Sequence, residues 1–247
     1  MILKVEDLSF GYNINRKVLN NINFSVNSTE SIGILGVSGC GKSTILKLIS
    51  GIIKKDTNNL LEGSISIDGL SPYEYIKKGK LGFMFQENAL MPNLTVRENV
   101  NFLLKVKGIK NYSKVDNFLE MVGLKNASDN LPKQLSGGMK TRVNLARSFI
   151  TEPELLLLDE PFTALDIGWK HTLYSEYLEF KRKFKPAIII VSHDINEIIT
   201  LSSKVIVLGK HGKIIKSCQL EPGINQNIIT KEIEEIIIKD HENTGEY

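Results

Sequence analysis

The feature that most constrains this chain is a glycine-rich loop between an apolar segment and a helix-forming segment. Residues 36–43 read Gly-Val-Ser-Gly-Cys-Gly-Lys-Ser and fit the pattern G-x-x-x-x-G-K-[ST]. Residues 31–35 before the loop favour a central strand, and residues 44–49 after it favour a helix. Glycines let backbone N–H groups surround phosphate oxygens, and a helix N-terminus adds partial positive charge. The pattern predicts an α/β fold with a phosphate-binding site.

Two side chains at the end of this loop have distinct expected roles. Lys42 is placed to reach the β- and γ-phosphates of a nucleotide, and the Ser43 hydroxyl to hold Mg²⁺. Cys40 occupies a variable position, where we interpret it as a small filler and not a nucleophile. The alternative is a flexible glycine turn that happens to contain Lys and Ser. The residues expected to contact the nucleotide here are Gly36, Val37, Ser38, Gly39, Cys40, Gly41, Lys42, Ser43 and Thr44.

A second motif is the hydrophobic run at residues 155–158, which ends in Asp159 and Glu160. Carboxylates at the end of a buried strand need a cation or a partner, because burying an unpaired charge is costly. Asp159 is therefore a candidate Mg²⁺ ligand, and Glu160 a candidate general base or water-positioning residue facing the γ-phosphate. The alternative is a pair of acids that caps a helix before Pro161.

The third motif is the turn Ser136-Gly137-Gly138, which opens a helix after Leu135. It presents a hydroxyl and free backbone N–H groups, and so predicts a second anion site. One nucleotide does not need two such sites from one chain. Ser136 and its helix are therefore expected to serve the nucleotide bound by another copy.

Composition and charge exclude several classes of protein. In 247 residues, 42% are hydrophobic and the net charge is +3, too small to indicate nucleic acid as a partner. No apolar run approaches the roughly 20 residues of a transmembrane helix, and the N-terminus does not read as a signal peptide. The two cysteines form neither a disulfide framework nor a metal motif. A role at a membrane would require a partner.

The hydrophobic pattern divides the chain into regions. Alternation at residues 22–26 and 64–68 predicts strands early in the chain, and the runs at 155–158, 188–191 and 205–208 predict buried strands. Helices are expected after the capping box of Thr95 and Glu98, at 114–122, after Gly138, and at 174–184, 194–201 and 231–239. The pattern predicts an α/β nucleotide-binding core with a helical insertion near residues 88–137.

These three motifs, in this order and spacing, resemble those of the ATP-binding subunits of ABC transporters, over residues 1 to about 215. The resemblance implies a P-loop ATPase core with an N-terminal antiparallel β subdomain and an inserted α-helical subdomain. It divides the chain into an ATPase domain, 1–230, and a short C-terminal helix and tail, 231–247. It implies ATP and Mg²⁺ as cofactors.

Four further positions match this family one at a time. Tyr12 lies where the family has an adenine-stacking aromatic residue, and Gln86 matches the glutamine that contacts Mg²⁺ or the attacking water. His193 matches the histidine that senses the γ-phosphate. Asp166 ends the segment 163–166, which resembles the loop that crosses to the partner subunit. Catalysis is then expected from Glu160, His193, Gln86 and Lys42, and Mg²⁺ binding from Ser43, Gln86 and Asp159.

The resemblance also implies how such a chain works. Two copies form a head-to-tail dimer, in which Ser136, Gly137 and Gly138 of one copy complete the nucleotide site of the other. Residues 87–99 and Met139 are similar to those of nitrate, sulfonate and taurine importer ATPases, although Asn93 departs from that subfamily. The expected partners are membrane-spanning permease subunits and a solute-binding protein, with this chain at the cytoplasmic face of the membrane. The alternative is a soluble ABC ATPase that acts on a protein scaffold, as in iron–sulfur cluster assembly.

Overall fold

The computed structural model describes residues 1–87, 89–163, 167–220 and 226–242. The chain divides into two compact units, one formed by Met1–Lys78 with Ala187–Tyr247 and the other by Gly79–Pro186. The loop at residues 36–43 belongs to the first unit, and Asp159 and Ser136 belong to the second. The boundaries expected at residues 230 and 231 stay a prediction.

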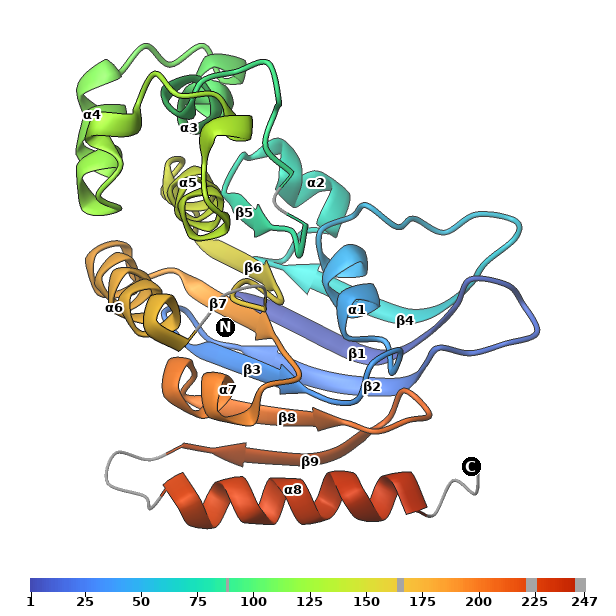
Figure 1. Ribbon diagram of the computed structural model, residues 1–247. Helices are drawn as coiled ribbons and strands as arrows, with labels where there is room; N and C mark the ends of the chain where they lie inside the picture. The colour runs from blue at the N-terminus through green and yellow to red at the C-terminus, as the bar shows by residue number, and fades with distance from the viewer. Residues whose placement is uncertain (88, 164–166, 221–225, 243–247) are drawn as a thin grey trace. The chain divides into compact units, whose positions relative to one another are not determined.

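The first unit contains an antiparallel sheet with the order β2-β1-β4. Its strands are β1 (Leu3–Gly11), β2 (Leu19–Val26) and β4 (Leu60–Ile67) (Figure 1). The predicted alternation in β2 is confirmed, since Ile22, Phe24 and Val26 are buried. The short helix α2 (Pro72–Lys77), which we did not predict, follows the sheet and begins with a capping box of Ser71 and Glu74.

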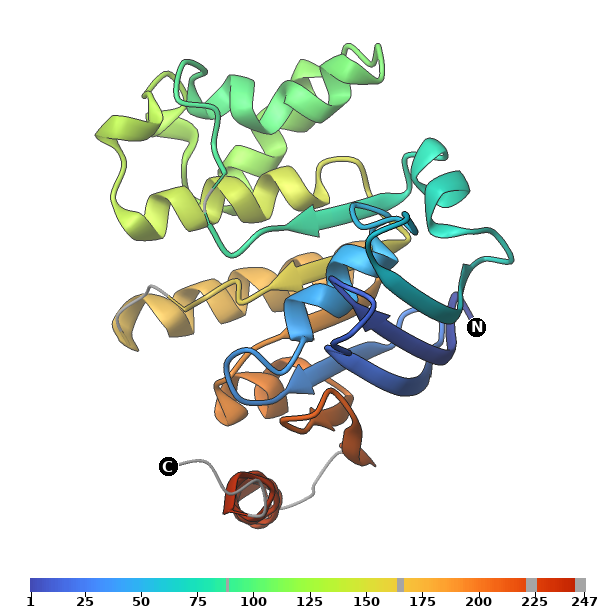
Figure 2. The same ribbon diagram turned by 90° about the vertical axis from the view of Figure 1, so that its right-hand side faces the viewer.

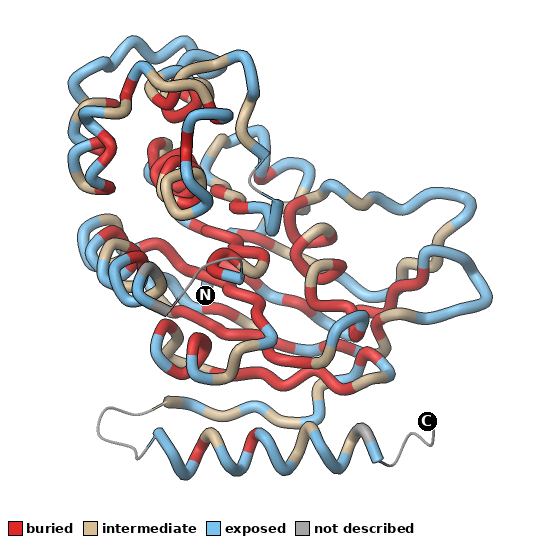
Figure 3. Tube along the Cα trace, in the orientation of Figure 1, coloured by how far each residue is buried: buried red, intermediate tan, exposed pale blue. Residues whose placement is uncertain are grey.

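A second sheet in this unit positions the glycine-rich loop. Parallel strands lie in the order β7 (Ala187–Val191), β3 (Ser31–Leu35) and β8 (Lys204–Leu208), and β9 (Ile214–Gln219) pairs antiparallel with β8. Every residue of β3 and β7 is buried, as Figure 3 shows, which confirms the reading of continuous apolar runs as central strands. Because Ile34 pairs with Val191, the carboxyl ends of β3 and β7 meet at one edge.

The described part of the first unit also contains the helices α1 (Lys42–Ile49), α7 (Ile195–Leu201) and α8 (Gln226–Glu242). The helix α7 agrees with the predicted 194–201 to within one residue, since Asp194 is its N-cap. The helix α8, seen end-on beside β8 and β9 in Figure 2, is longer than the predicted 231–239. Its first turn is stabilised by burial of Ile229, which lies four residues before the buried Ile233 and therefore on the same helix face.

The described part of the second unit combines a pair of parallel strands with α-helices. The strands are β5 (Leu81–Met84) and β6 (Leu155–Asp159), and the helices are α3 (Val96–Val106), α4 (Tyr112–Met121), α5 (Gly137–Phe149) and α6 (Ile167–Phe184). Two 3₁₀ turns, Lys125–Ala127 and Pro132–Gln134, lie between α4 and α5. The capping box of Thr95 and Glu98 forms as predicted.

An aromatic cluster joins α4, α5 and α6. Phe118 lies 5.4 Å from Phe180 and 5.2 Å from Phe184 between ring centroids, and Phe149 lies 4.9 Å from Phe180. Rings at these distances add favourable contacts to the burial of their apolar surface. Among the described residues, no helix has both the length and the apolar character needed to cross a membrane.

Candidate functional site

The glycine-rich loop requires glycine at defined points of its path from β3 to α1. Gly39 and Gly41 have φ angles of 81° and 108°, a region that side chains rarely adopt. Gly36 has a different reason, since a Cβ there would lie 2.4 Å from the carbonyl oxygen of Leu208 and 2.6 Å from Cys40 Sγ. The loop therefore packs its own backbone against the end of β8 and turns sharply into the helix.

Lys42 is folded back over the loop that precedes it. Its side chain is 5% exposed, and Nζ donates hydrogen bonds to the carbonyl oxygens of Gly36, at 2.7 Å, and Val37, at 3.0 Å. Ser43 and Thr44 follow in the first turn of α1, with Ser43 half-buried and Thr44 buried. A positive charge and a helix N-terminus thus occur together, as a phosphate site requires.

Cys40 lies inside the loop and is buried. Burial raises the pKa of its thiol, and the nearby positive charge of Lys42 opposes that shift only in part. A buried thiol with a raised pKa is a poor nucleophile. The environment of Cys40 therefore agrees with its interpretation as a filler.

Tyr12 lies just beyond β1, close to the start of α1. Its side chain is 54% exposed, and its hydroxyl is 3.1 Å from Oγ1 of Thr44. The ring of Phe10 meets the ring of Tyr12 edge-on at 5.0 Å. Tyr12 thus presents an exposed aromatic surface beside the loop at residues 36–43, where stacking on a nucleobase is possible.

His193 follows β7 at the edge where β3 enters the loop. It is exposed, while Ser192 before it is buried and accepts a hydrogen bond from the Asp194 backbone N–H at 3.0 Å. Asp194 in turn caps α7 by accepting from the backbone N–H of Glu197. Adjacent parallel strands therefore bring His193 and the loop to the same edge of the sheet.

In the second unit, the structure brings together two of the predicted catalytic residues. Nε2 of Gln86, just after β5, donates to Oε2 of Glu160 at 3.3 Å, and Oγ1 of Thr163 lies 3.1 Å from the same oxygen. Glu160 has a φ of 43°, which turns the chain sharply after β6. Asp159 is 4% exposed. The arrangement holds the Glu160 carboxylate in place with two polar side chains.

Ser136 forms the N-cap of α5. Its hydroxyl accepts a hydrogen bond from the backbone N–H of Met139 at 3.3 Å, and both Ser136 and Gly137 are exposed. A Cβ at Gly137 would meet nothing within 4 Å, so open space lies over this helix start. Asp166 lies outside the described residues.

No group of three or more His, Cys, Asp or Glu side chains in the described part of the chain is arranged to hold a metal ion. The residues predicted to bind Mg²⁺ include only one acid, Asp159, together with the Ser43 hydroxyl and the Gln86 amide oxygen. These oxygen donors are of the kind that Mg²⁺ prefers, since it keeps several waters and takes phosphate oxygens when a nucleotide is bound.

Comparison with known proteins identifies the chain. The family model for ABC transporters matches residues 19–163, which is more than half of the chain. The chain belongs to the ABC transporter family. It is an ATP-binding subunit of this family, and the predictions of an ATPase and of the P-loop fold with an N-terminal antiparallel sheet and a helical insert are confirmed.

Several relatives of this ABC protein are similar over most of their length. It is 40% identical to the aliphatic sulfonates import ATP-binding protein SsuB of Bacillus subtilis, over 89% of this chain and 84% of the relative. It is 40% identical to an ABC transporter ATP-binding protein of Methanocaldococcus jannaschii, over 87% of this chain and 81% of the relative. A solved ATP-binding cassette, a dimer in a post-hydrolysis state with ADP and Pi, shares 29% identity and a TM-score of 0.77, over 89% of this chain and 99% of that chain.

Sequence reasoning missed two polar residues of this ABC protein that hold the segment around Gln86. Asn144 and Arg147 lie in α5 next to the buried apolar residues Val143 and Ala146, and both are buried. The sequence gives little signal for them, because Asn144 and Arg147 share a helix face with Lys140, Thr141 and Ser148, and a polar face of this kind is normally expected to face solvent.

Proposed function

We propose that this chain is the ATP-hydrolysing subunit of an importer for a small organic anion such as an aliphatic sulfonate. In this proposal two copies act at the cytoplasmic face of the membrane with membrane-spanning permease subunits and a solute-binding protein. The import of a sulfonate is suggested by the named relatives from Bacillus subtilis and Bacillus licheniformis, the second being 36% identical over 98% of this chain. The observation that carries the hydrolytic role is the hydrogen bond between Gln86 and Glu160.

The catalytic roles follow from the chemistry of each side chain. Lys42 neutralises charge on the β- and γ-phosphates, and His193 hydrogen-bonds the γ-phosphate. Glu160 accepts the proton of the attacking water, which Gln86 orients. Tyr12 stacks on the adenine ring. The two hydrogen bonds to Glu160 support this assignment, because they fix the carboxylate that must meet the water.

We also propose Mg²⁺ as the metal of this site, held by Ser43, Gln86 and Asp159. When bound, the ion neutralises phosphate charge that develops during transfer. The Asp159 carboxylate at the end of β6 supports this choice, because a carboxylate oxygen is a ligand that Mg²⁺ prefers.

The second nucleotide contact comes from another copy of the chain. Ser136, Gly137 and Gly138 would donate a hydroxyl and backbone N–H groups to the γ-phosphate bound by the partner copy. Two observations support this role: the helix start is exposed, and the similar solved cassettes are dimers. ATP then holds two copies together, and hydrolysis removes the phosphate that joins them.

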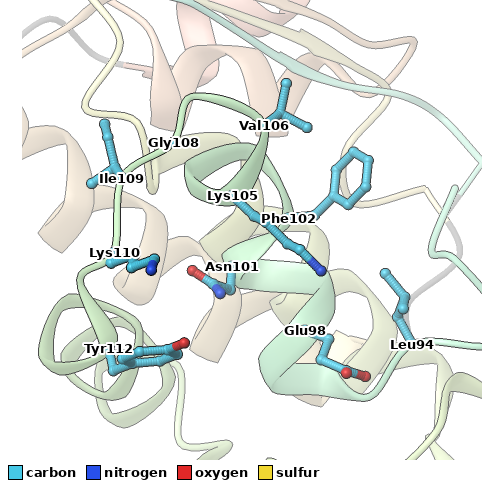
Figure 4. A pocket seen from close by; sticks show the side chains of 10 residues that line it. All are labelled: Leu94, Glu98, Asn101, Phe102, Lys105, Val106, Gly108, Ile109, Lys110 and Tyr112. Atoms are coloured by element: carbon cyan, nitrogen blue, oxygen red, sulfur yellow. The ribbon is translucent and has the colours of Figure 1, made fainter.

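A groove in the helical part of the second unit is the proposed docking site for a short helix of the permease. It has a volume of about 550 Å³ and is formed by α3, the connection after it and the start of α4 (Figure 4). Phe102, Val106, Ile109 and Tyr112 give it an apolar lining, and the last three of these side chains are 46–69% exposed. Exposed apolar side chains gathered in one groove are typical of an interaction site.

Polar groups of this groove add a second argument. Lys105 and Lys110 outnumber one acid, Glu98, among the lining residues, and this balance favours an occupant with acidic groups. Asn101 is part of α3, and its side chain points toward Lys110 and Tyr112 in Figure 4; its buried Oδ1 accepts no hydrogen bond from any described residue. A donor on the permease helix would satisfy it.

The test uses tagged Glu160→Gln protein, which should bind ATP but not turn it over. We expect an ATP-dependent dimer by light scattering, a fall in the hydrolysis rate of at least about a hundredfold, and co-purification of a multi-spanning membrane protein from mild-detergent extracts of its own cells. Lys42→Ala is the matched control, because it should lose the ATP-dependent dimer.

Each part of the proposal can fail separately. Wild-type turnover by Glu160→Gln would remove Glu160 from the role of base. Recovery of soluble scaffold proteins alone would contradict the importer role and favour a soluble ABC ATPase that acts on a protein scaffold. The proposed ATPase site would be unaffected by that result. Recovery of a permease without a solute-binding protein would argue against import.

A further inference from the structure

Two buried side chains of α5 attach the segment that contains Gln86. Nδ2 of Asn144 lies 3.5 Å from the carbonyl oxygen of Phe85, and NH1 of Arg147 donates to the carbonyl oxygen of Ala89 at 2.7 Å. NH2 of Arg147 also donates to Oδ1 of Asn144 at 2.9 Å. The pair therefore contacts the chain on both sides of Gln86, one residue before it and three residues after it.

Burying the polar groups of Asn144 and Arg147 costs free energy unless hydrogen bonds compensate for the lost contact with water. Asn144 is fully buried and Arg147 is only 9% exposed. Burial lowers the pKa of the Arg147 guanidinium. In the part of the chain that the structure describes, its hydrogen bonds go to two neutral oxygens, and no carboxylate lies within ion-pair distance of it. A buried cation without a counter-charge is unfavourable. The hydrogen bonds to these two acceptors therefore offset the cost of removing the guanidinium from water.

The attached segment also has a third anchor further along the chain. Asn99 of α3 accepts a hydrogen bond from the Met91 backbone N–H at 2.8 Å and donates to the Met91 carbonyl oxygen at 3.2 Å. The segment that begins at Phe85 is thus held from α5 at its start and from α3 at its end. Gln86, between these anchors, is exposed and donates to Glu160.

We infer that Arg147 and Asn144 are positioning residues that attach the Gln86 segment to α5, so that the placement of Ser136 at the other end of this helix determines whether Gln86 meets Glu160. A single helix of 13 residues, Gly137–Phe149, connects the two ends. When the partner's nucleotide engages Ser136, any movement of α5 is passed to Gln86 through three hydrogen bonds. The inference rests on the proposed roles of Gln86, Glu160 and Ser136.

The principal test replaces Arg147 with lysine. Lys keeps the positive charge but lacks the planar fork, so it cannot donate to Ala89 and Asn144 in the same geometry. We expect kcat to fall about tenfold or more, while the affinity for a fluorescent ATP analogue stays within about twofold, because ATP binding uses the loop at residues 36–43. Hydrogen exchange of the peptide that includes residues 85–91 should become faster, while α5 stays protected.

A second variant and a matched control keep the test decisive. Asn144→Asp retains the size of the side chain and can form an ion pair with Arg147, but it can no longer donate to Phe85. It should fold and, like Arg147→Lys, show a lower kcat with nearly unchanged affinity for the ATP analogue. Ser148→Ala removes another buried polar group of α5, whose hydroxyl donates to the Leu145 carbonyl oxygen of the same helix, and should leave kcat unchanged.

The results separate this inference from the proposed function. Gln86→Ala, measured in parallel, should be slow. If it keeps the wild-type kcat, the role of Gln86 fails and the inference with it. If Gln86→Ala is slow but folded Arg147→Lys and Asn144→Asp keep the wild-type kcat and exchange rates, the inference alone is overturned.

Discussion

The pair of Arg142 and Glu176 predicts how the stability of the second unit depends on pH. NH2 of Arg142, in α5, lies 2.9 Å from Oε1 of Glu176, in α6, and both side chains are only 13% exposed. Burial raises the pKa of Glu176 from 4.5 to about 7. Arg142 lowers this pKa by less than burial raises it, and the charge of Glu179 adds to the rise.

The sign and size of the effect follow from proton binding. Because the folded-state pKa is raised, the folded protein holds this proton at pH values where the unfolded chain has lost it. The contribution of the Glu176 proton to the free energy of unfolding is therefore fully present below about pH 4.5. It is lost as the pH rises toward 7, and above that pH the loss is complete. A rise of this size corresponds to a loss of about 3 kcal/mol.

The test compares the wild type with Glu176→Gln, which resembles the protonated carboxyl and cannot titrate. We expect the variant to become more stable relative to the wild type as the pH rises. The free energy of unfolding of the variant minus that of the wild type should increase by about 2 to 3 kcal/mol between pH 5 and pH 8. Urea denaturation followed by circular dichroism measures it. Glu179→Gln should retain most of the wild-type pH dependence. Parallel stability curves for the wild type and Glu176→Gln would refute the reasoning.

Two further substitutions test the loop and the Gln86 segment. Gly36→Ala places a Cβ 2.4 Å from the Leu208 carbonyl oxygen, so we expect affinity for a fluorescent ATP analogue to fall at least about tenfold, with equilibrium titration as the measurement. Asn99→Ala removes hydrogen bonds to the backbone of Met91 and Leu94 in a fully buried place, and should lower the free energy of unfolding by about 3 kcal/mol in urea denaturation. An unchanged transition midpoint for Asn99→Ala would contradict this.

The sequence predicted the strands of this fold better than the ends of its helices. Continuous apolar runs located β3, β6 and β8 because a strand buried on both faces has no polar positions to confuse the pattern. The helix α6, however, begins at Ile167 and not at residue 174. Gly168 and the β-branched Thr172 weaken the helical signal there, and burial of Leu173 offsets their low propensity.

The candidate site was predicted unevenly for a related reason. Lys42 and Glu160 are candidates from local motifs and Gln86 is a candidate from the family resemblance, and their roles stay predictions. The residues that hold them depend on which distant segments pack together. Arg147 bonds to Ala89, which is 58 positions away, and no local pattern indicates that contact.

The helix α5 shows why those hidden contacts matter for function. Ser136 caps its start, Arg142 pairs with α6 near its middle, and Arg147 holds the Gln86 segment near its end. A helix of this length spans about 20 Å and transmits displacement along its axis with little deformation. Because the apolar face of α5 is buried among its neighbours, the polar contacts at these three points fix its register. A shift at Ser136 therefore has to be accommodated by the contact of Arg142, by the contacts of Arg147 or by both. Of these, only the contacts of Arg147 connect to the segment that contains Gln86.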